Sequence, residues 1–141
     1  MNQTIKESLE KIYSKIPNFN CQCCHQCCGP IIWFKPEEIL IREYLEKNKI
    51  KRVIWTKEEF KKNNIKCPYL INEKCIIYPV RPIVCRLQGN ICELKCKSLS
   101  NNDKLMSAEE LENIKKEFFQ LIRSIDGMNT FYTSIKLQNH Y

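Results

Sequence analysis

The sequence predicts a small, mostly α domain whose irregular cysteine-rich core is organised by metal, with a short hairpin inside it. Three observations support this fold class. Apolar residues repeat at helical spacing near both ends, and all ten cysteines lie in the region between. The chain of 141 residues is long enough for one domain. We expect a single domain over residues 1–141. A helical lead covers 1–20, a cysteine-cluster metal-binding core covers 21–100, and a closing helix and tail cover 101–141.

The helical lead is amphipathic. Thr4 and Glu7 fit a capping box, because each side chain can accept a hydrogen bond from the other residue's backbone N–H. Pro17 is expected to end the helix. Apolar side chains repeat at helical spacing at Ile5, Leu9, Ile12 and Ile16.

The central region contains signals for short elements. Pro36, followed by two glutamates at 37–38, is typical of the first turn of a helix. Thr56 and Glu59 predict a second, shorter helix start. The polar residues 72–74 separate two apolar runs, which indicates a tight hairpin.

The closing segment predicts one strong helix. Ser107 and Glu110 form a capping box, and Asp126–Gly127 is expected to stop the helix. The tail predicts an edge strand through Phe131, Thr133, Ile135 and Leu137. One face of the helix is apolar at Leu111, Ile114, Phe118, Leu121, Ile122 and Ile125.

The spacing of the first cysteines indicates metal ligands. Cys21, Cys24 and Cys27 are separated by two residues each, so consecutive sulfurs can converge on one centre. Cys28 follows at once and points away from Cys27 in most backbone conformations, which suits a second centre. A remote fourth ligand comes from Cys67, Cys75 or Cys85.

Disulfides are the main rival explanation. The charged N-terminal segment 1–15 has no apolar leader, and no run approaches the length of a membrane span. We therefore expect a cytoplasmic chain with reduced thiols. The adjacent pairs Cys23–Cys24 and Cys27–Cys28 also make a set of bridges hard to arrange.

The ordered motifs resemble a known family. C-x2-C-x2-C-C at 21–28 is followed by Pro-Glu-Glu at 36–38, Cys-Pro-Tyr-Leu at 67–70, Cys-Ile-Ile-Tyr at 75–78 and Arg-Pro-Ile-Val-Cys-Arg at 81–86. This pattern resembles the YkgJ-type cysteine-cluster family, described as a zinc- or iron-chelating domain. The resemblance covers about residues 20 to 96.

The resemblance implies about eight ligand cysteines. The last one follows Cys85, and both Cys92 and Cys96 are candidates, whereas Cys23 is extra. A related cluster occurs in flagellin lysine methylases, where it is taken to hold a 4Fe–4S cluster. The implied ligands are Cys21, Cys24, Cys27, Cys28, Cys67, Cys75 and Cys85, with Cys92 or Cys96.

The identity of the metal is a choice between iron–sulfur and zinc. A compact triple with widely spaced single cysteines favours a 4Fe–4S cluster, whereas structural zinc prefers paired knuckles.

Other residues near the cysteines have predicted roles at the metal. Arg81 and Arg86 flank Cys85, where they can donate to cluster sulfurs and raise the reduction potential of the cluster; the alternative is a surface salt bridge. His25 lies inside the loop, where thiols already suffice as ligands. Aromatic side chains are expected to shield the metal at Trp33, Phe34, Trp55, Tyr69 and Tyr78.

Three function classes remain open. The favoured one is an iron–sulfur protein with an electron-transfer, subunit or maturation role; the alternatives are a structural zinc-binding interaction module and a metal-dependent modifying enzyme. No set of residues typical of a catalytic site stands out, although a cysteine that is not a metal ligand could act as a catalytic thiol. The net charge of +7 comes mostly from lysine, and metal-bound thiolates would offset it. We expect the protein to bind a protein partner or to belong to a larger complex. We do not expect it to bind nucleic acid or a membrane.

Overall fold

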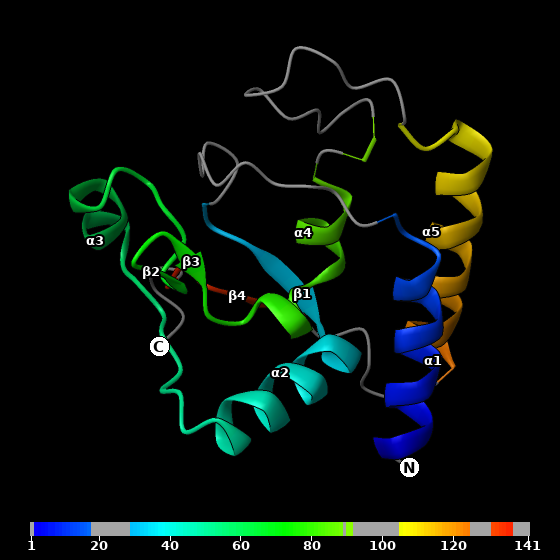
Figure 1. Cartoon of the computed structure of the whole chain (residues 1–141), viewed down its shortest axis with the longest axis horizontal. Coiled ribbons are helices and arrows are strands. Elements are labelled where there is room, and N and C mark those ends of the chain that lie inside the picture. The colour runs from blue at the N-terminus through cyan, green and yellow to red at the C-terminus, as the bar shows by residue number, and fades with distance from the viewer. Residues whose placement is uncertain (1, 18–28, 89, 92–104, 125–130, 137–141) are drawn as a thin grey trace.

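A computed structural model describes residues 2–17, 29–88, 90–91, 105–124 and 131–136 (Figure 1). The predicted mostly α class is confirmed: helices dominate these ranges, and the sheets are short two-stranded pairs. Within the same ranges, no helix combines the length and the apolar character needed to cross a membrane.

Two long helices form one side of the molecule. Helix α1 (Asn2–Ser14) lies beside α5 (Ala108–Arg123), and α2 (Lys35–Lys47) packs against both (Figure 1). Their apolar faces meet because each repeats at helical spacing. We call this part the helical half. Its two core clusters contain Ile5, Leu9, Tyr13, Leu40, Phe118 and Ile122, and Ile12, Ile16, Ile91, Met106, Leu111 and Ile114.

The ends of these helices test the capping predictions. The Ser107 hydroxyl accepts from the Glu110 N–H at 3.1 Å, and the Glu110 carboxylate accepts from the Ser107 N–H at 2.9 Å, as predicted. The capping box at Thr4 was wrong, because α1 already begins at Asn2 and Thr4 lies inside it. Burial of the apolar stripe from Ile5 onward stabilises this first turn without that cap. The stop at 126–127 lies outside the described residues.

Helix α2 separates two cores. Pro36 and the two glutamates occupy its first turn, as predicted. Leu40 faces the helical half, whereas Ile41 and Leu45 face a third cluster. We call that second part, residues 50–80 with Trp33, the cysteine half. Its core contains Trp33, Ile41, Leu45, Cys67, Tyr69 and Ile77.

The cysteine half consists of short elements joined by turns. Helix α3 (Lys57–Lys62) has the predicted Thr56–Glu59 capping box. Strands β2 (Leu70–Ile71) and β3 (Lys74–Cys75) form the predicted hairpin, and Asn72 and Glu73 turn it with φ of 52° and 64°. A 3₁₀ turn, η1 (Tyr78–Val80), leads to α4 (Ile83–Leu87).

The C-terminal tail connects the two halves. Strand β4 (Phe131–Thr133) pairs antiparallel with β1 (Ile32–Phe34), which confirms a strand in the tail as far as Thr133. Beyond it, Ile135 forms a parallel bridge with Trp55. The pairing partner β1 was not predicted, because three residues carry too little periodicity. Leu137 lies outside the described residues.

Candidate metal centre

Two of the predicted ligands lie in the hairpin region of the cysteine half. Cys67 is buried just before β2, and Cys75 is half-buried at the end of β3, opposite Leu70. The backbone N–H two residues further on donates to each sulfur: that of Tyr69 to Cys67 and that of Ile77 to Cys75. Such donors stabilise a thiolate and are typical of the surroundings of metal-bound sulfur.

Burial keeps both thiols neutral when no cation is near. The pKa of Cys67 is raised to about 11, mainly by burial and slightly by the neighbouring Cys75, although the Tyr69 N–H lowers it. Burial also raises the pKa of Cys75, which the Ile77 N–H and the charge of Arg81 oppose. Both sulfurs therefore need a compensating cation before they can persist as thiolates.

Cys85 reaches the same region from another element. It lies in the middle of α4, only partly exposed. Burial raises its pKa strongly, and Cys67, Cys75 and Glu37 raise it further, whereas the positive charge of Arg81 opposes them. Cys67 and Cys75 thus influence the ionisation of Cys85 electrostatically, although the three cysteines are far apart in sequence.

Gly29 lies close to the backbone that precedes Cys67. Gly29 follows Cys28 directly, and a Cβ placed on Gly29 would lie 3.2 Å from the carbonyl oxygen of Ile65, two residues before Cys67. The lack of a side chain at Gly29 permits this close approach. The remaining predicted cysteines, Cys21, Cys24, Cys27, Cys28, Cys92 and Cys96, lie outside the described residues, as do Cys23 and His25.

The described residues alone do not complete a site. Among them, no group of three or more His, Cys, Asp or Glu side chains is arranged to hold a metal ion. Their chemistry nevertheless fits a thiolate-bound metal, because buried sulfurs with backbone N–H donors suit either zinc or an iron–sulfur cluster. The ligand set as a whole stays a prediction.

The two predicted arginines have different surroundings. The Arg81 guanidinium lies 3.9 Å from the centre of the Tyr78 ring, and its charge acts on Cys75 and Cys85. Arg86 instead lies 3.7 Å from the centre of the Tyr13 ring and donates to the Arg81 and Pro79 carbonyl oxygens. Within the described ranges, neither arginine forms an ion pair with a carboxylate, so the salt-bridge alternative has no support there.

Glu37 is a buried carboxylate that the sequence interpretation treated only as part of a helix start. It is 0% exposed. Its Oε2 accepts from the Tyr13 hydroxyl and from the Ile83 N–H, each at 2.5 Å, and its Oε1 accepts from the Phe34 N–H at 3.3 Å. Burial raises its pKa to about 7 although these donors lower it. In the sequence, the Pro-Glu-Glu motif at residues 36–38 was the feature that could have drawn attention to this carboxylate.

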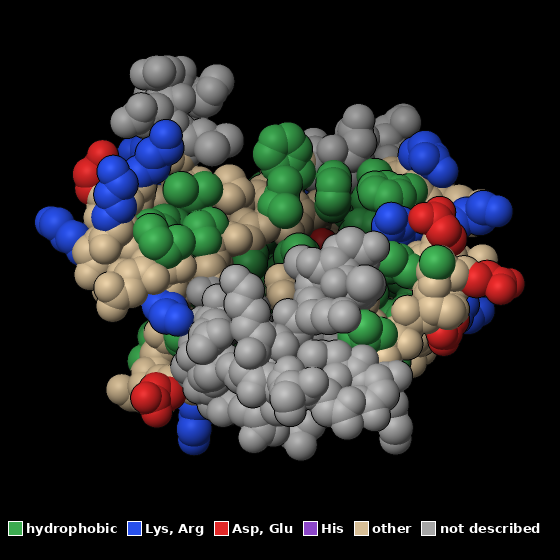
Figure 2. Space-filling model, turned by 90° about the horizontal axis from the view of Figure 1, so that it is seen from above, with side chains coloured by type: hydrophobic (Ala, Val, Ile, Leu, Met, Phe, Trp, Pro, Cys, Tyr) green, Lys and Arg blue, Asp and Glu red, His purple; other side chains and the backbone are tan. Residues whose placement is uncertain are grey.

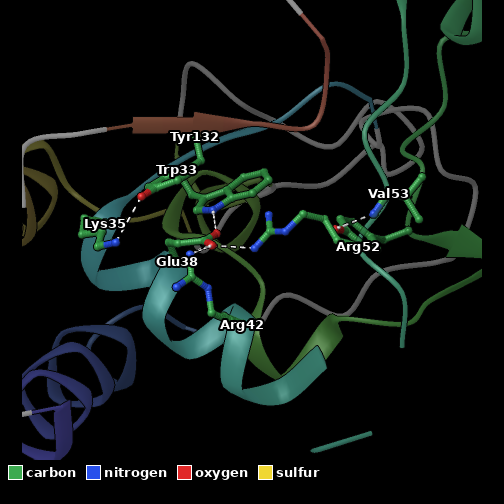
Figure 3. A network of polar contacts seen from close by, with 8 residues as sticks. Trp33, Lys35, Glu38, Arg42, Arg52, Val53 and Tyr132 are labelled. Atoms are coloured by element: carbon green, nitrogen blue, oxygen red, sulfur yellow. Dashed lines mark hydrogen bonds and ion pairs between the residues drawn. The ribbon is translucent and has the colours of Figure 1, made fainter. Parts of the chain in front are cut away.

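Glu38 forms a separate buried network (Figure 3). Its Oε1 accepts from the Trp33 indole N–H at 2.9 Å, and its Oε2 accepts from Arg42 at 3.0 Å and Arg52 at 2.5 Å. The Tyr132 ring stacks on Trp33, with ring centres 6.5 Å apart. Two cations thus compensate this carboxylate, which joins α2 to β1 and to the start of the cysteine half.

The aromatic side chains predicted to shield the metal have different surroundings. Trp33 and Tyr69 are buried in the core of the cysteine half, and Phe34 packs on Phe118 with ring centres 5.9 Å apart. Tyr78 is 45% exposed and lies under the Arg81 guanidinium instead. Side chains three residues apart eclipse in a 3₁₀ turn, and this spacing brings Arg81 over the Tyr78 ring.

A groove of about 610 Å³ runs between α1, α2 and the segment after β3. Among the described residues that line it there is no cysteine. Its lining side chains are Lys6, Glu10, Tyr13, Ser14, Ile16, Leu40, Glu43, Tyr44, Lys47, Pro79, Val80 and Arg86.

The described residues form a small, mostly α protein that contains one buried and two partly buried cysteines. A family model described as "CxxCxxCC: Putative zinc- or iron-chelating domain" matches residues 20–113. The chain belongs to this family, which confirms the resemblance seen in the sequence. No curated protein and no solved structure matches the chain.

Proposed function

We propose that this protein binds a 4Fe–4S cluster through the cysteine loop at 21–28 and the remote cysteines Cys67, Cys75 and Cys85, and that it serves an electron-transfer, subunit or maturation role. The observation that carries the proposal is the electrostatic influence of Cys67 and Cys75 on Cys85, a residue from a separate segment, together with the backbone N–H groups that contact Cys67 and Cys75. Single ligands from separate elements together with a compact triple suit a cluster better than paired zinc knuckles do.

The chain supplies charge and shielding for such a centre. Arg81 acts on Cys75 and Cys85, so its positive charge favours their ionised form. Trp33, Tyr69 and Ile77 make the adjoining core apolar and exclude water. A bound cluster would supply one-electron redox chemistry, and these surroundings would tune its potential.

A structural zinc module is the second candidate. The family description allows either metal, and N–H donors two residues beyond a cysteine serve zinc as well as iron. A zinc site would make the cysteine half a stable interaction surface with no redox role.

We also propose a protein partner in the reducing cytoplasm. Large apolar side chains reach the surface on more than one element, and Figure 2 shows apolar groups gathered on one face. Exposed groups of this kind suit a protein surface better than they suit nucleic acid. They are Ile32, Ile54, Ile65, Ile71, Tyr78, Phe119 and Phe131, each at least 41% exposed.

Metal analysis after purification without oxygen tests the proposal. Iron with acid-labile sulfide, and visible absorbance that dithionite bleaches, are expected. Stoichiometric zinc without sulfide would replace the cluster by the zinc module.

Cysteine variants test the ligands. Cys67→Ser and Cys85→Ser should each lower metal occupancy sharply, because a hydroxyl is a poor ligand for a soft metal. Cys23→Ser is the matched control and should keep full occupancy. Full loading of the Cys67 and Cys85 variants would show that the remote cysteines do not complete the site.

A further inference from the structure

The short helix that carries Cys85 has no capping side chain of its own. Helix α4 contains five residues, and its N-cap is Pro82, whose side chain makes no capping hydrogen bond. A helix this short has little stability by itself, and its first N–H groups need acceptors. The orientation of Cys85, two residues after the start of α4, therefore depends on groups outside the helix.

Glu37 supplies the acceptor at the start of α4. Its Oε2 accepts from the N–H of Ile83, the first residue of α4. The same oxygen accepts from the Tyr13 hydroxyl on α1. The carboxylate therefore ties α4 to α1 and α2, whereas Cys85 is influenced electrostatically by Cys67 and Cys75 of the cysteine half.

A second contact with α1 holds the other end of α4. Arg86 directly follows Cys85, and its guanidinium lies 3.7 Å from the centre of the Tyr13 ring. Arg86 also donates to the carbonyl oxygens of Arg81 and Pro79. Tyr13 is thus linked to α4 at two points. Its hydroxyl donates to Glu37, which accepts from Ile83 before Cys85, and its ring contacts Arg86 after Cys85.

We propose that Glu37, supported by Tyr13, is a positioning residue for the metal centre: it fixes the start of α4 and so sets where Cys85 presents its sulfur. This rests on the proposed metal-binding function. It assigns to the helical half a direct influence on the metal affinity of the cysteine half.

The adjacent residue offers a matched control. Glu38 is also on α2 and almost completely buried, but its partners are Trp33, Arg42 and Arg52, and none of them belongs to α4. Glu37→Gln and Glu38→Gln each neutralise one buried carboxylate without changing its shape. In Glu37→Gln, the new side-chain NH₂ group faces the backbone N–H of Ile83 or of Phe34, so one of these donors loses its acceptor. Glu38→Gln leaves both of these N–H groups with their acceptors.

The experiment uses Co²⁺ as the probe metal. The full-length reduced chain is titrated with Co²⁺ as the wild type and as the Glu37→Gln, Tyr13→Phe and Glu38→Gln variants. Affinity and the thiolate-to-cobalt absorption band are recorded together with the melting temperature. A purely structural role would lower the melting temperature without altering the band.

We expect Glu37→Gln to weaken Co²⁺ binding about tenfold and to shift the band, as losses in the surroundings of metal ligands commonly do. Glu38→Gln should keep the wild-type band and affinity even where its melting temperature falls. If Glu37→Gln does not fold, Tyr13→Phe decides the question, with a smaller loss and a band shift in the same direction.

Two results would overturn the inference, and they can be told apart. Wild-type band and affinity in Tyr13→Phe and in any folded Glu37→Gln protein would remove the positioning role and leave the metal centre intact. A wild-type protein that shows no thiolate-to-cobalt band would remove the proposed metal-binding function, and the positioning role with it.

Discussion

The helical half and the cysteine half reach their order by different means. In the helical half, α1 and α5 span 13 and 16 residues. Each buries an apolar stripe, and Leu9 of α1 and Phe118 of α5 belong to the same core cluster. In the cysteine half, the helices and strands span two to six residues. Elements that short are not stable alone, so their arrangement depends on what their turns bind.

The contrast lies in where the stabilising free energy comes from. Periodic apolar side chains provide it in the helical half, through burial. In the cysteine half, the partly buried Cys75 packs against the core cluster that contains Cys67, and a metal bound there would contribute most of the stabilising free energy. The halves should therefore respond differently to the same treatment.

Metal removal should separate the halves most strongly. Thiolate–metal binding contributes on the order of 10 kcal/mol in zinc-finger peptides, and that free energy is folding free energy. After chelation, or oxidation of a cluster, amides of residues 50–80 should lose protection from hydrogen exchange while those of α1 and α5 keep it. Equal protection of residues 50–80 with and without metal would contradict a metal-organised half.

Core truncations should separate stability from metal binding. Phe118→Ala removes a ring that is 2% exposed in the helical half, and about 3–5 kcal/mol of unfolding free energy should be lost. The metal spectrum should not change. Ile77→Ala is the paired variant in the cysteine half, 1% exposed, and its own N–H donates to Cys75.

Denaturant unfolding and the metal spectrum, measured on both variants, check this pair. Ile77→Ala should lower stability and also alter the spectrum. The division into halves fails if Phe118→Ala alters the spectrum as much as Ile77→Ala does.

The smallest expected effect concerns Glu37, where the halves join. Burial raises its pKa from 4.5 to about 7 in the folded protein, so the folded state binds a proton more tightly than the unfolded chain does. The free energy of unfolding should therefore fall as pH rises from 4.5 to 7, by up to about 3 kcal/mol from this group. Below pH 4.5 the group is protonated in both states and adds no further slope.

Unfolding free energies of the wild type and Glu37→Gln across this pH range measure the effect. The variant has no titrating group at position 37, so its profile should be flatter by that amount. Parallel profiles would mean that Glu37 does not titrate in this range.

Local signals were predicted well where a few neighbouring residues decide the structure. The capping boxes at Thr56 and Ser107 and the turn at 72–74 are present as expected, because their partners are three or fewer residues apart. The same motif failed at Thr4. There α1 already begins at Asn2, and the packing of Ile5 and Leu9 stabilises the helix that contains Thr4.

The sequence by itself determined the kind of chemistry and the family. Cysteine spacing and the motifs around 67–70 and 81–86 identified a metal-chelating cysteine domain, because ligand type and local order are properties of the chain. They also marked Cys67, Cys75 and Cys85 as members of one predicted ligand set.

Only the tertiary structure decided what surrounds those cysteines. Burial, which raises the pKa of Cys67, and the different placements of Arg81 and Arg86 arise from contacts between distant segments. Glu37 shows this most clearly: the sequence marks a helix start, but its hydrogen bonds reach Tyr13, 24 residues away, and Ile83, 46 residues away. Such pairings depend on packing of whole elements, which no local pattern encodes.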